Sequence, residues 1–504
     1  MTSGNRDIRL AEEVLGIGTG SRETLDTLGR RVFSAAVESY RATGSHPRPV
    51  IEALSDLASS GNPNTRKAAE TLIFRDLVEG LSDAFEPDLA CLYDALFSQI
   101  IDRQRHQRGG ELLDEALHRF GLRTEEDIRN RRLRLRSSPP RPVRATEIRK
   151  IFVFSRVTVG ADVAITSVIM RKLRRTWPEA RILLAGPARA GELFAGDPGI
   201  GMLEAPYPRH GSLLDRLSSW VGMLGALDRE RGQLAAGEVL FVDTDSRLTQ
   251  LGLLPVTGDA ESYIFESRTY GESRTYGAEG QDSLGHLAAR WAEETFGRDP
   301  EPVYPYVSPD PAHLAFARES VARLRRGKGN RVVALNFGVG GNPGKRVGEE
   351  FEARLLRRLL AGGHTIVLDK GIGGETAPND RILAGLRDQG ARILEMEDRA
   401  GRPMRGAETE TDVLTWSGGI GVFSSLIAAS DLYVGYDSAF QHIAAALAVP
   451  VVAVVPGSPG PLFRRRWTPC SRAAVRIVPA DDAGSVDPDR LLGDTLAAVA
   501  DSHR

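Results

Sequence analysis

The sequence predicts an α/β protein with two successive Rossmann-like arrays, preceded by an all-helical region. From residue 149 onward, short apolar runs alternate with stretches whose apolar residues recur every three or four positions. Before residue 135 only the helical spacing occurs. We therefore expect a helical domain at 1–135, a basic proline-containing linker at 136–148, a first Rossmann-like domain at 149–310 and a second at 311–504.

Length and composition agree with several domains. A chain of 504 residues is too long for one hydrophobic core, and 41% hydrophobic with 26% charged residues is typical of globular proteins. The 65 basic and 67 acidic residues nearly cancel, so the overall charge does not indicate binding to nucleic acid or to an anionic membrane.

Location is predicted from what the sequence lacks. Cys91 and Cys470 lie too far apart for a disulfide framework or a metal motif, which favours a reducing compartment. The first residues carry neither the basic start nor the apolar centre of a signal peptide, and no apolar run approaches the roughly 20 residues of a membrane span. We expect a cytoplasmic protein without a transmembrane segment.

The helical region comes first along the chain. Segments such as 23–42 and 88–106 have amphipathic helical spacing, and the region carries no motif that we can attach to chemistry, although it could bind a protein partner. The Arg- and Pro-rich stretch 131–150 is expected to be a solvated linker. A patch for an acidic partner or a membrane surface is the alternative.

The two arrays follow. In the first array we expect strands at 150–156, 180–186 and 238–245 and a helix at 162–177. In the second we expect helices at 313–326 and 351–363 and strands at 331–338, 364–371 and 391–396. The strands are continuous apolar runs rather than alternating ones, as in parallel sheets covered on both faces.

The most informative segment is a strand–helix–strand unit at 430–457. A strand at 432–435 leads into a helix at 438–448, and Asp437, Ser438, Gln441 and His442 crowd the first turn of that helix. A helix N-terminus after a sheet strand is a common phosphate site, because free N–H groups and the helix dipole both favour an anion there. Alternatively, Ser438 and Gln441 form a capping box without any ligand, and His442 is a structural histidine.

The run Asp437-Ser438-Ala439-Phe440-Gln441-His442 resembles the Asp-Ser/Thr-Gly-x-x-His signature of the ADP-heptose:lipopolysaccharide heptosyltransferases, glycosyltransferase family 9. The resemblance covers about 150–479 in five short motifs. It implies a GT-B fold, with two Rossmann-like domains facing a cleft, and an inverting, metal-independent glycosyltransferase without a cofactor. The implied donor is a nucleotide diphosphate sugar, favouring a heptose-like ADP-sugar, and the implied acceptor is a hydroxyl group. Ala439 departs from the family's glycine.

The start of the first array supports the same resemblance. The run from Arg156 to Asp162 is similar to the family's Arg-x-Ser-x-x-Gly-Asp, which implies that Arg156 binds the acceptor and that Asp162 is the general base. Ala161 replaces the family's glycine, and Gly160 stands one position earlier. A plain helix N-cap is the alternative for Asp162.

The second array opens on a glycine-rich loop that ends in Lys345-Arg346, in a chain with only six lysines. Glycines let backbone N–H groups approach a diphosphate, and a lysine neutralises a departing diphosphate. Lys345 is therefore a catalytic candidate, and a flexible solvent loop is the alternative. The donor-binding candidates of this array are Asn336, Gly338, Gly340, Gly341, Glu375, Asp437, Ser438, Ala439, Gln441 and His442.

Two further features are ambiguous. Asp243, at the end of an acidic strand, matches the family's acceptor side or simply caps its strand. The repeat ESRTY at 266–270 and 272–276 is a duplication in a surface loop or a loop that faces the acceptor. For the whole chain, two other functions stay open: a non-catalytic binding or scaffold protein derived from the GT-B fold, and a nucleotide-sugar epimerase.

Overall fold

The computed structural model describes residues 3–17, 22–138, 142–143, 147–208, 211–271, 282–326, 330–340, 343–371, 373, 376–397, 410–457, 460–480 and 487–502. The chain divides into two compact units. Unit 1 comprises Met1–Val157, Ala180–Pro187 and Met202–Ala278, and unit 2 comprises Thr158–Glu179, Ala188–Gly201 and Glu279–Arg504.

Unit 1 contains a five-stranded sheet in the order β3-β2-β1-β4-β5. Its strands are β1 (Lys150–Phe154), β2 (Arg181–Gly186), β3 (Ile200–Glu204), β4 (Val239–Asp243) and β5 (Ser262–Ile264). β1 pairs in parallel with both β2 and β4, and β4 pairs in parallel with β5. All five residues of β4 are buried, which agrees with the continuous apolar pattern of the sequence.

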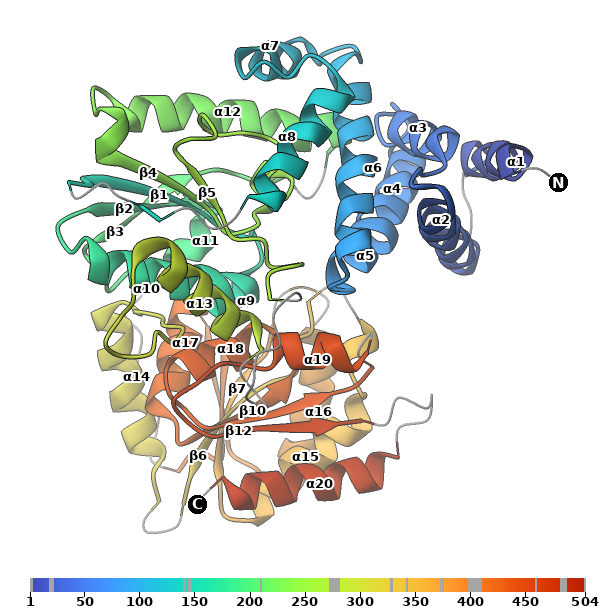
Figure 1. Ribbon diagram of the computed structural model, residues 1–504. Helices are drawn as coiled ribbons and strands as arrows, with labels where there is room; N and C mark the ends of the chain where they lie inside the picture. The colour runs from blue at the N-terminus through green and yellow to red at the C-terminus, as the bar shows by residue number, and fades with distance from the viewer. Residues whose placement is uncertain are drawn as a thin grey trace. The chain divides into compact units, whose positions relative to one another are not determined.

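Most helices of unit 1 come before this sheet in the chain, and the first of them lie beside the sheet and not over it (Figure 1). They are α1 (Ser3–Leu15), α2 (Arg22–Thr43), α3 (Arg48–Leu57), α4 (Pro63–Thr71), the π-helix η1 (Leu72–Glu79), α5 (Gly80–Asp83), α6 (Pro87–Arg105), α7 (Glu111–Arg119), α8 (Glu125–Ser137) and α12 (Leu213–Arg231). One apolar core runs from Leu10 in α1 to Leu254 after β4. The N-terminal helices and the first sheet therefore share a single core.

Local sequence explains where these helices begin. Thr124 and Asp127 form a capping box at the start of α8, and Pro87 opens α6 at a position where its missing N–H costs no hydrogen bond. The expectation of a solvated linker at 131–150 is wrong for its first part. Arg131 and Arg132 lie in α8 and are buried, because both guanidinium groups donate to backbone carbonyls and pair with carboxylates.

Unit 2 contains a seven-stranded sheet in the order β12-β11-β10-β6-β7-β9-β8. Its strands are β6 (Val332–Asn336), β7 (Thr365–Asp369), β8 (Ile393–Glu397), β9 (Val413–Ser417), β10 (Leu432–Tyr436), β11 (Val451–Val455) and β12 (Val475–Pro479), and every neighbouring pair is parallel. The carboxyl ends of β6, β7 and β10 therefore share one edge of the sheet. This edge is where α/β proteins bind ligands.

Helices cover both faces of this second sheet (Figure 1). One face packs under α15 (Glu349–Ala361), α16 (Thr376–Asp388) and α20 (Pro488–Asp501). The remaining helices of unit 2 are α9 (Val159–Ala161), the π-helix η2 (Asp162–Thr166), α10 (Ser167–Thr176), α11 (Ala188–Gly191), α13 (Leu284–Phe296), α14 (Pro311–Leu324), α17 (Ile420–Ala429), α18 (Ala439–Ala446) and α19 (Pro461–Trp467). α18 packs against β10 and β11, and also against α9 and η2.

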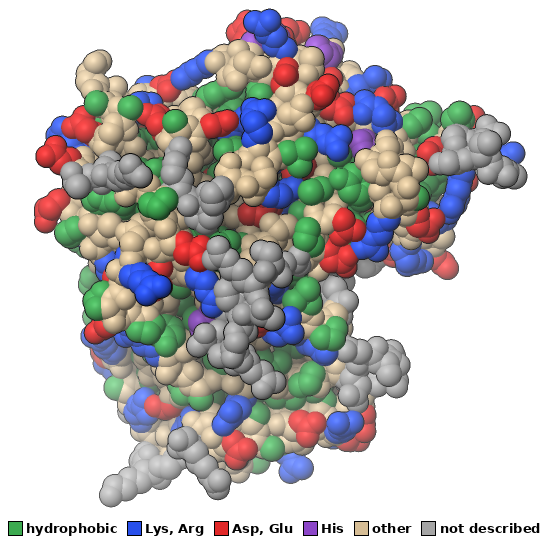
Figure 2. Space-filling view, in the orientation of Figure 1, with side chains coloured by type: hydrophobic (Ala, Val, Ile, Leu, Met, Phe, Trp, Pro, Cys, Tyr) green, Lys and Arg blue, Asp and Glu red, His purple; other side chains and the backbone are tan. Residues whose placement is uncertain are grey.

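The predicted α/β class, with two parallel sheets and an all-helical N-terminal region, is confirmed. Among the helices of the described residues, none has the length and apolarity needed to cross a bilayer. Acidic and basic side chains are interspersed over the face shown in Figure 2, as expected for a chain with a net charge of −2.

Candidate functional site

The turn between β10 and α18 is the centre of the candidate site. Ser438 is the N-cap of α18, with φ −149° and ψ 178°, but its side chain makes no capping hydrogen bond. Gln441 instead donates from Nε2 to Asp437 Oδ1 over 2.6 Å. The capping box, which was the structural alternative for these two residues, is therefore not formed. The first-turn N–H groups of α18 keep their capacity to bind an anion.

Lys345 reaches this turn from the glycine-rich loop. Its Nζ lies 2.6 Å from Asp437 Oδ2, and the two side chains are 26% and 12% exposed. The same Nζ lies 5.5 Å from the centroid of the Phe463 ring. The fold thus brings Lys345, the catalytic candidate of the loop, into contact with Asp437, which opens the signature, although the two residues are 92 positions apart in the sequence.

A second ion pair anchors the loop that carries Lys345. The guanidinium of Arg346 binds both oxygens of the buried Glu352 carboxylate in α15. The Tyr436 hydroxyl donates to Glu352 over 2.9 Å and accepts from the Val347 N–H. Burial, and then the neighbouring carboxylate, raises the pKa of Tyr436. The sequence analysis missed Glu352 and Tyr436, although an acid in the first turn after Lys345-Arg346 was a visible signal.

Asn336 connects three segments at the sheet edge. Its Nδ2 donates to Asp369 Oδ2 at the end of β7 over 2.7 Å, and its Oδ1 accepts from the Ser438 hydroxyl over 3.4 Å. Asp369 also accepts from the N–H of Gly371. The sequence analysis did not select Asp369, which ends the predicted strand beside Asn336. Two polar residues that end neighbouring parallel strands were the signal for it.

His442 lies one turn into α18 and is 5% exposed. Burial lowers the pKa of His442 to about 4, while Asp437 opposes this shift and Lys345 adds to it. The imidazole is therefore neutral at pH 7. Its ring meets Trp467 edge-on, with centroids 5.9 Å apart.

The neutral state of His442 predicts a specific pH dependence of stability. A lowered folded-state pKa means that the unfolded chain takes up a proton first, so stability is lost as pH falls from 6.5 towards 4. Over this pH window we expect the free energy of unfolding to fall by on the order of 3 kcal/mol more in wild type than in His442→Gln. Urea unfolding at several pH values measures this difference. Parallel curves for the two proteins would contradict the assignment.

Asp162 begins the π-helix η2 and is 1% exposed. Its Oδ1 accepts from the Thr166 hydroxyl over 2.9 Å. Thr158, not Asp162, is the N-cap of α9, so the N-cap alternative for Asp162 is not what the fold uses. Because α9 and η2 pack against α18, the structure brings the predicted base segment to the helix that carries the signature. π-helical turns often occur at functional sites.

The remaining described donor candidates differ in how exposed they are. Gly338 is buried, and Gly340 is exposed with a φ of +63°, which favours glycine. Ala439 is the first residue of α18 and is partly exposed. Gly341 and Glu375 lie outside the described residues.

The two acceptor candidates lie in unit 1, where both make internal contacts. Arg156 donates to the Thr244 carbonyl over 2.6 Å and to the Ser267 hydroxyl over 3.1 Å. Asp243 is 3% exposed and accepts from the Ser246 N–H and the Thr249 hydroxyl. Burial raises the pKa of Asp243, opposed by these two hydrogen bonds. The contacts of Asp243 match its strand-capping alternative.

The first copy of the ESRTY repeat is not a surface loop. Glu266, Ser267 and Arg268 are all buried, and Ser267 donates to Asp245 over 2.7 Å. The expectation of a surface loop is therefore wrong for 266–268, and the acceptor-facing alternative stays a prediction. The second copy, at 272–276, lies outside the described residues.

The buried repeat joins the N-terminal helices through an ionic network. Glu266 pairs with Arg132 and Arg136 of α8 and with Arg268, and Arg136 also pairs with the fully buried Asp94 of α6. Burial acts to raise the pKa of Glu266, but the charges of Arg132, Arg268 and Arg136 outweigh it and hold this pKa below its usual range. The network fixes two helices of the N-terminal region onto the loop that follows β5.

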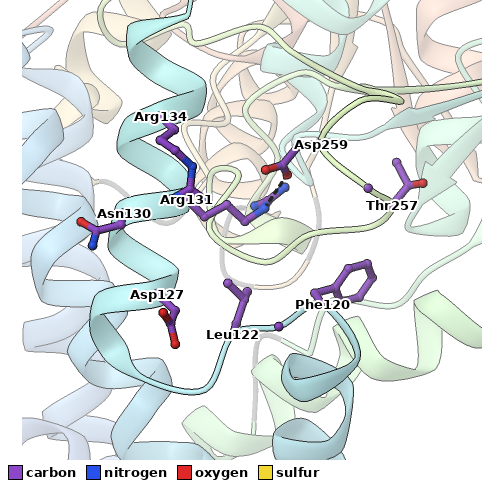
Figure 3. Close-up of a pocket in the computed structure, with 10 residues that line it drawn as sticks. Phe120, Leu122, Asp127, Asn130, Arg131, Arg134, Thr257 and Asp259 are labelled. Carbon is purple, nitrogen blue, oxygen red and sulfur yellow. Dashed lines mark hydrogen bonds and ion pairs between the residues drawn. The ribbon is translucent and has the colours of Figure 1, made fainter.

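A pocket of about 290 Å³ lies elsewhere in unit 1, between the α7–α8 turn, α8 and the loop before β5. Figure 3 shows Arg131 reaching across to Asp259, with Phe120 and Leu122 on the other side. Among the described residues, none of those predicted to bind donor or acceptor or to act in catalysis lines this pocket.

Comparison with known proteins finds similarity at the level of structure. No protein-family model and no curated protein matches the sequence. Solved structures similar to this chain include a glycosyl transferase family 9 protein from Veillonella parvula (14% identity, TM-score 0.49, covering 70% of this chain and 97% of that one). ADP-heptose lps heptosyltransferase II of E. coli matches at 17% identity and TM-score 0.46, covering 70% and 100% of the two chains. E. coli heptosyltransferase WaaC with ADP matches at 11% identity and TM-score 0.47, covering 70% and 99%.

Proposed function

We propose that this protein is a glycosyltransferase that transfers a sugar from a nucleotide diphosphate sugar to a hydroxyl acceptor, with inversion at the anomeric carbon and without a metal ion. The observation that carries the proposal is the meeting of Lys345 with Asp437 at the uncapped first turn of α18. This places a positive charge beside backbone N–H groups, and a diphosphate is the ligand that suits both.

The donor would bind at this turn. A diphosphate on the N–H groups of α18 would draw the ammonium of Lys345 away from Asp437, while the Gln441 amide holds Asp437 in place. Arg346, Glu352 and Tyr436 fix the loop, so the lysine reaches the donor with little loss of entropy. The motif resemblance favours an ADP-sugar with a heptose-like sugar.

The proposed chemistry is a direct displacement at the anomeric carbon. The acceptor oxygen forms a new bond to the anomeric carbon from the face opposite the diphosphate, and its proton passes to the carboxylate of Asp162. The bond between the anomeric carbon and the diphosphate oxygen breaks, and the electron pair leaves with the diphosphate. Lys345 and the α18 N–H groups stabilise the negative charge that develops there. Arg156 and Asp243 stay candidates for the acceptor side, and Gly341 and Glu375 for the donor side.

Nucleotide release tests the proposal and the role of Asp162. We expect wild type to release ADP from an ADP-sugar slowly with water and faster with a suitable hydroxyl acceptor, as followed by chromatography. Asp162→Asn should lower the acceptor-dependent rate by about 100-fold or more, because general-base catalysis contributes roughly this much. Altered sugar on an intact nucleotide would indicate an epimerase instead. An unchanged donor would indicate a binding or scaffold protein.

A further inference from the structure

Gly160 lies in α9, two residues before Asp162, and approaches α18 closely. A Cβ atom built on Gly160 would lie 3.1 Å from Ala439 Cα, 3.6 Å from Ala439 Cβ and 3.5 Å from His442 Cδ2. The first of these distances is shorter than most contacts of real Cβ atoms. The lack of a side chain at Gly160 therefore allows α9 to approach α18 this closely.

The backbone gives no other reason for a glycine here. The φ angle of Gly160 is not positive, so any residue type can adopt its backbone conformation. A glycine in a helical segment costs conformational entropy relative to alanine, and such a cost is kept where the missing side chain makes room for a neighbour. Here the neighbour is Ala439, the first residue of α18, and Asp437 lies just before the N-cap of that helix.

We propose that Gly160 and Ala439 form one steric pair that seats the Asp162 segment on the first turn of α18. The methyl group of Ala439 lies beside the bare face of Gly160, so it packs against α9. Gly160 is then a positioning residue: it sets how closely the proposed base approaches the proposed donor helix and His442. This inference rests on the proposed function and deepens it.

A double-mutant cycle tests the pairing. The proteins are wild type, Gly160→Ala, Ala439→Gly and the double variant, and the readouts are the thermal unfolding midpoint, the ADP dissociation constant and the rate of ADP release from an ADP-sugar. We expect Gly160→Ala to slow ADP release about 10-fold or more, which corresponds to about 1.4 kcal/mol, and to lower the midpoint. The double variant should recover little of either loss, because Ala439→Gly keeps the Cα atom that the new methyl group at position 160 approaches most closely and removes only a methyl group at ordinary contact distance.

A matched control separates positioning from a general effect of alanine in a helix. Gly385 lies in α16 of the same unit, and a Cβ there would have nothing within 4 Å. Gly385→Ala should leave ADP binding and release unchanged and should not lower the midpoint. Full recovery of both losses in the double variant, or a Gly160→Ala protein with wild-type ADP release, would overturn the inference. If wild type binds no nucleotide, the proposed function and the positioning role fail together, and the thermal midpoints of wild type and Gly160→Ala alone decide whether the close contact exists.

Discussion

Replacing Glu266 by glutamine is expected to destabilise unit 1 by about 3–5 kcal/mol. Glu266 is the shared partner of three arginines, Arg132, Arg136 and Arg268, whose side chains are between 1% and 13% exposed. Glutamine keeps the shape but removes the charge, which leaves buried guanidinium groups without their main counter-ion. Breaking a buried pair on one side costs far more than removing an exposed one.

The measurement is unfolding in denaturant, monitored by hydrogen exchange of peptides from α6 and α8. Asp228→Asn is the matched control, because Asp228 pairs with Arg119 at the surface of the same unit, with 52% and 55% exposure. We expect the control to change stability by less than about 0.5 kcal/mol. The pKa of Glu266 is lowered, so its contribution is present above its unfolded value of about 4.5 and is lost as pH falls below that value. Equal effects of the two substitutions at pH 7 would contradict the network.

This network explains why the helical region belongs to unit 1. Asp94 of α6 and two arginines of α8 complete an ionic cluster with the loop after β5, and the same helices share their apolar core with β1 and β4. The Asp245 carboxylate of this cluster also accepts from Ser267, which in turn accepts from Arg156. The N-terminal helices therefore support the segment that carries the acceptor candidate.

Replacing Lys345 by methionine is expected to weaken ADP binding by about 10- to 100-fold. A charge-assisted hydrogen bond contributes roughly 1.5–3 kcal/mol, and each 1.4 kcal/mol is tenfold in affinity. Methionine keeps the length and apolar stem of lysine while removing the charge. Equilibrium dialysis with labelled ADP measures the change.

Lys370→Met is the control for loss of a lysine. Lys370 follows β7 of the same sheet and pairs with Asp380 and Glu395, but it makes no contact with Asp437 in the described structure. We expect ADP affinity in this variant to stay within about twofold of wild type. A similar loss in both variants would mean that net charge, and not the position of Lys345, governs binding.

The sequence predicted those features that depend on local pattern. Continuous apolar runs located β1, β6 and β10, and the helical spacing located α10 and α15, because buried strands and amphipathic helices have distinct periods. The motif resemblance placed both Lys345 and the signature at the diphosphate, and the structure brings them together because they follow β6 and β10, neighbouring parallel strands whose carboxyl ends share one edge.

Features that depend on long-range partners could not be predicted in this way. Arginines in 131–137 have the composition of a solvated segment, and distant partners such as Glu266 and Asp259 make the burial of these side chains favourable. Gly160 carries no signal of its close contact with Ala439, because the space around a glycine is set by tertiary packing. Gln441 fits a capping box by spacing, yet its amide binds one oxygen of Asp437 while Lys345, 92 positions away from Asp437, binds the other.

Calorimetric titration of ADP, UDP and GDP into the wild-type protein tests the central claim most directly. The account predicts saturable binding of one nucleoside diphosphate, with ADP the tightest, because the uncapped first turn of α18 and Lys345 together form a diphosphate site. If neither ADP, UDP nor GDP produces a binding heat, and none of them competes with another for the protein, the result would contradict the glycosyltransferase proposal.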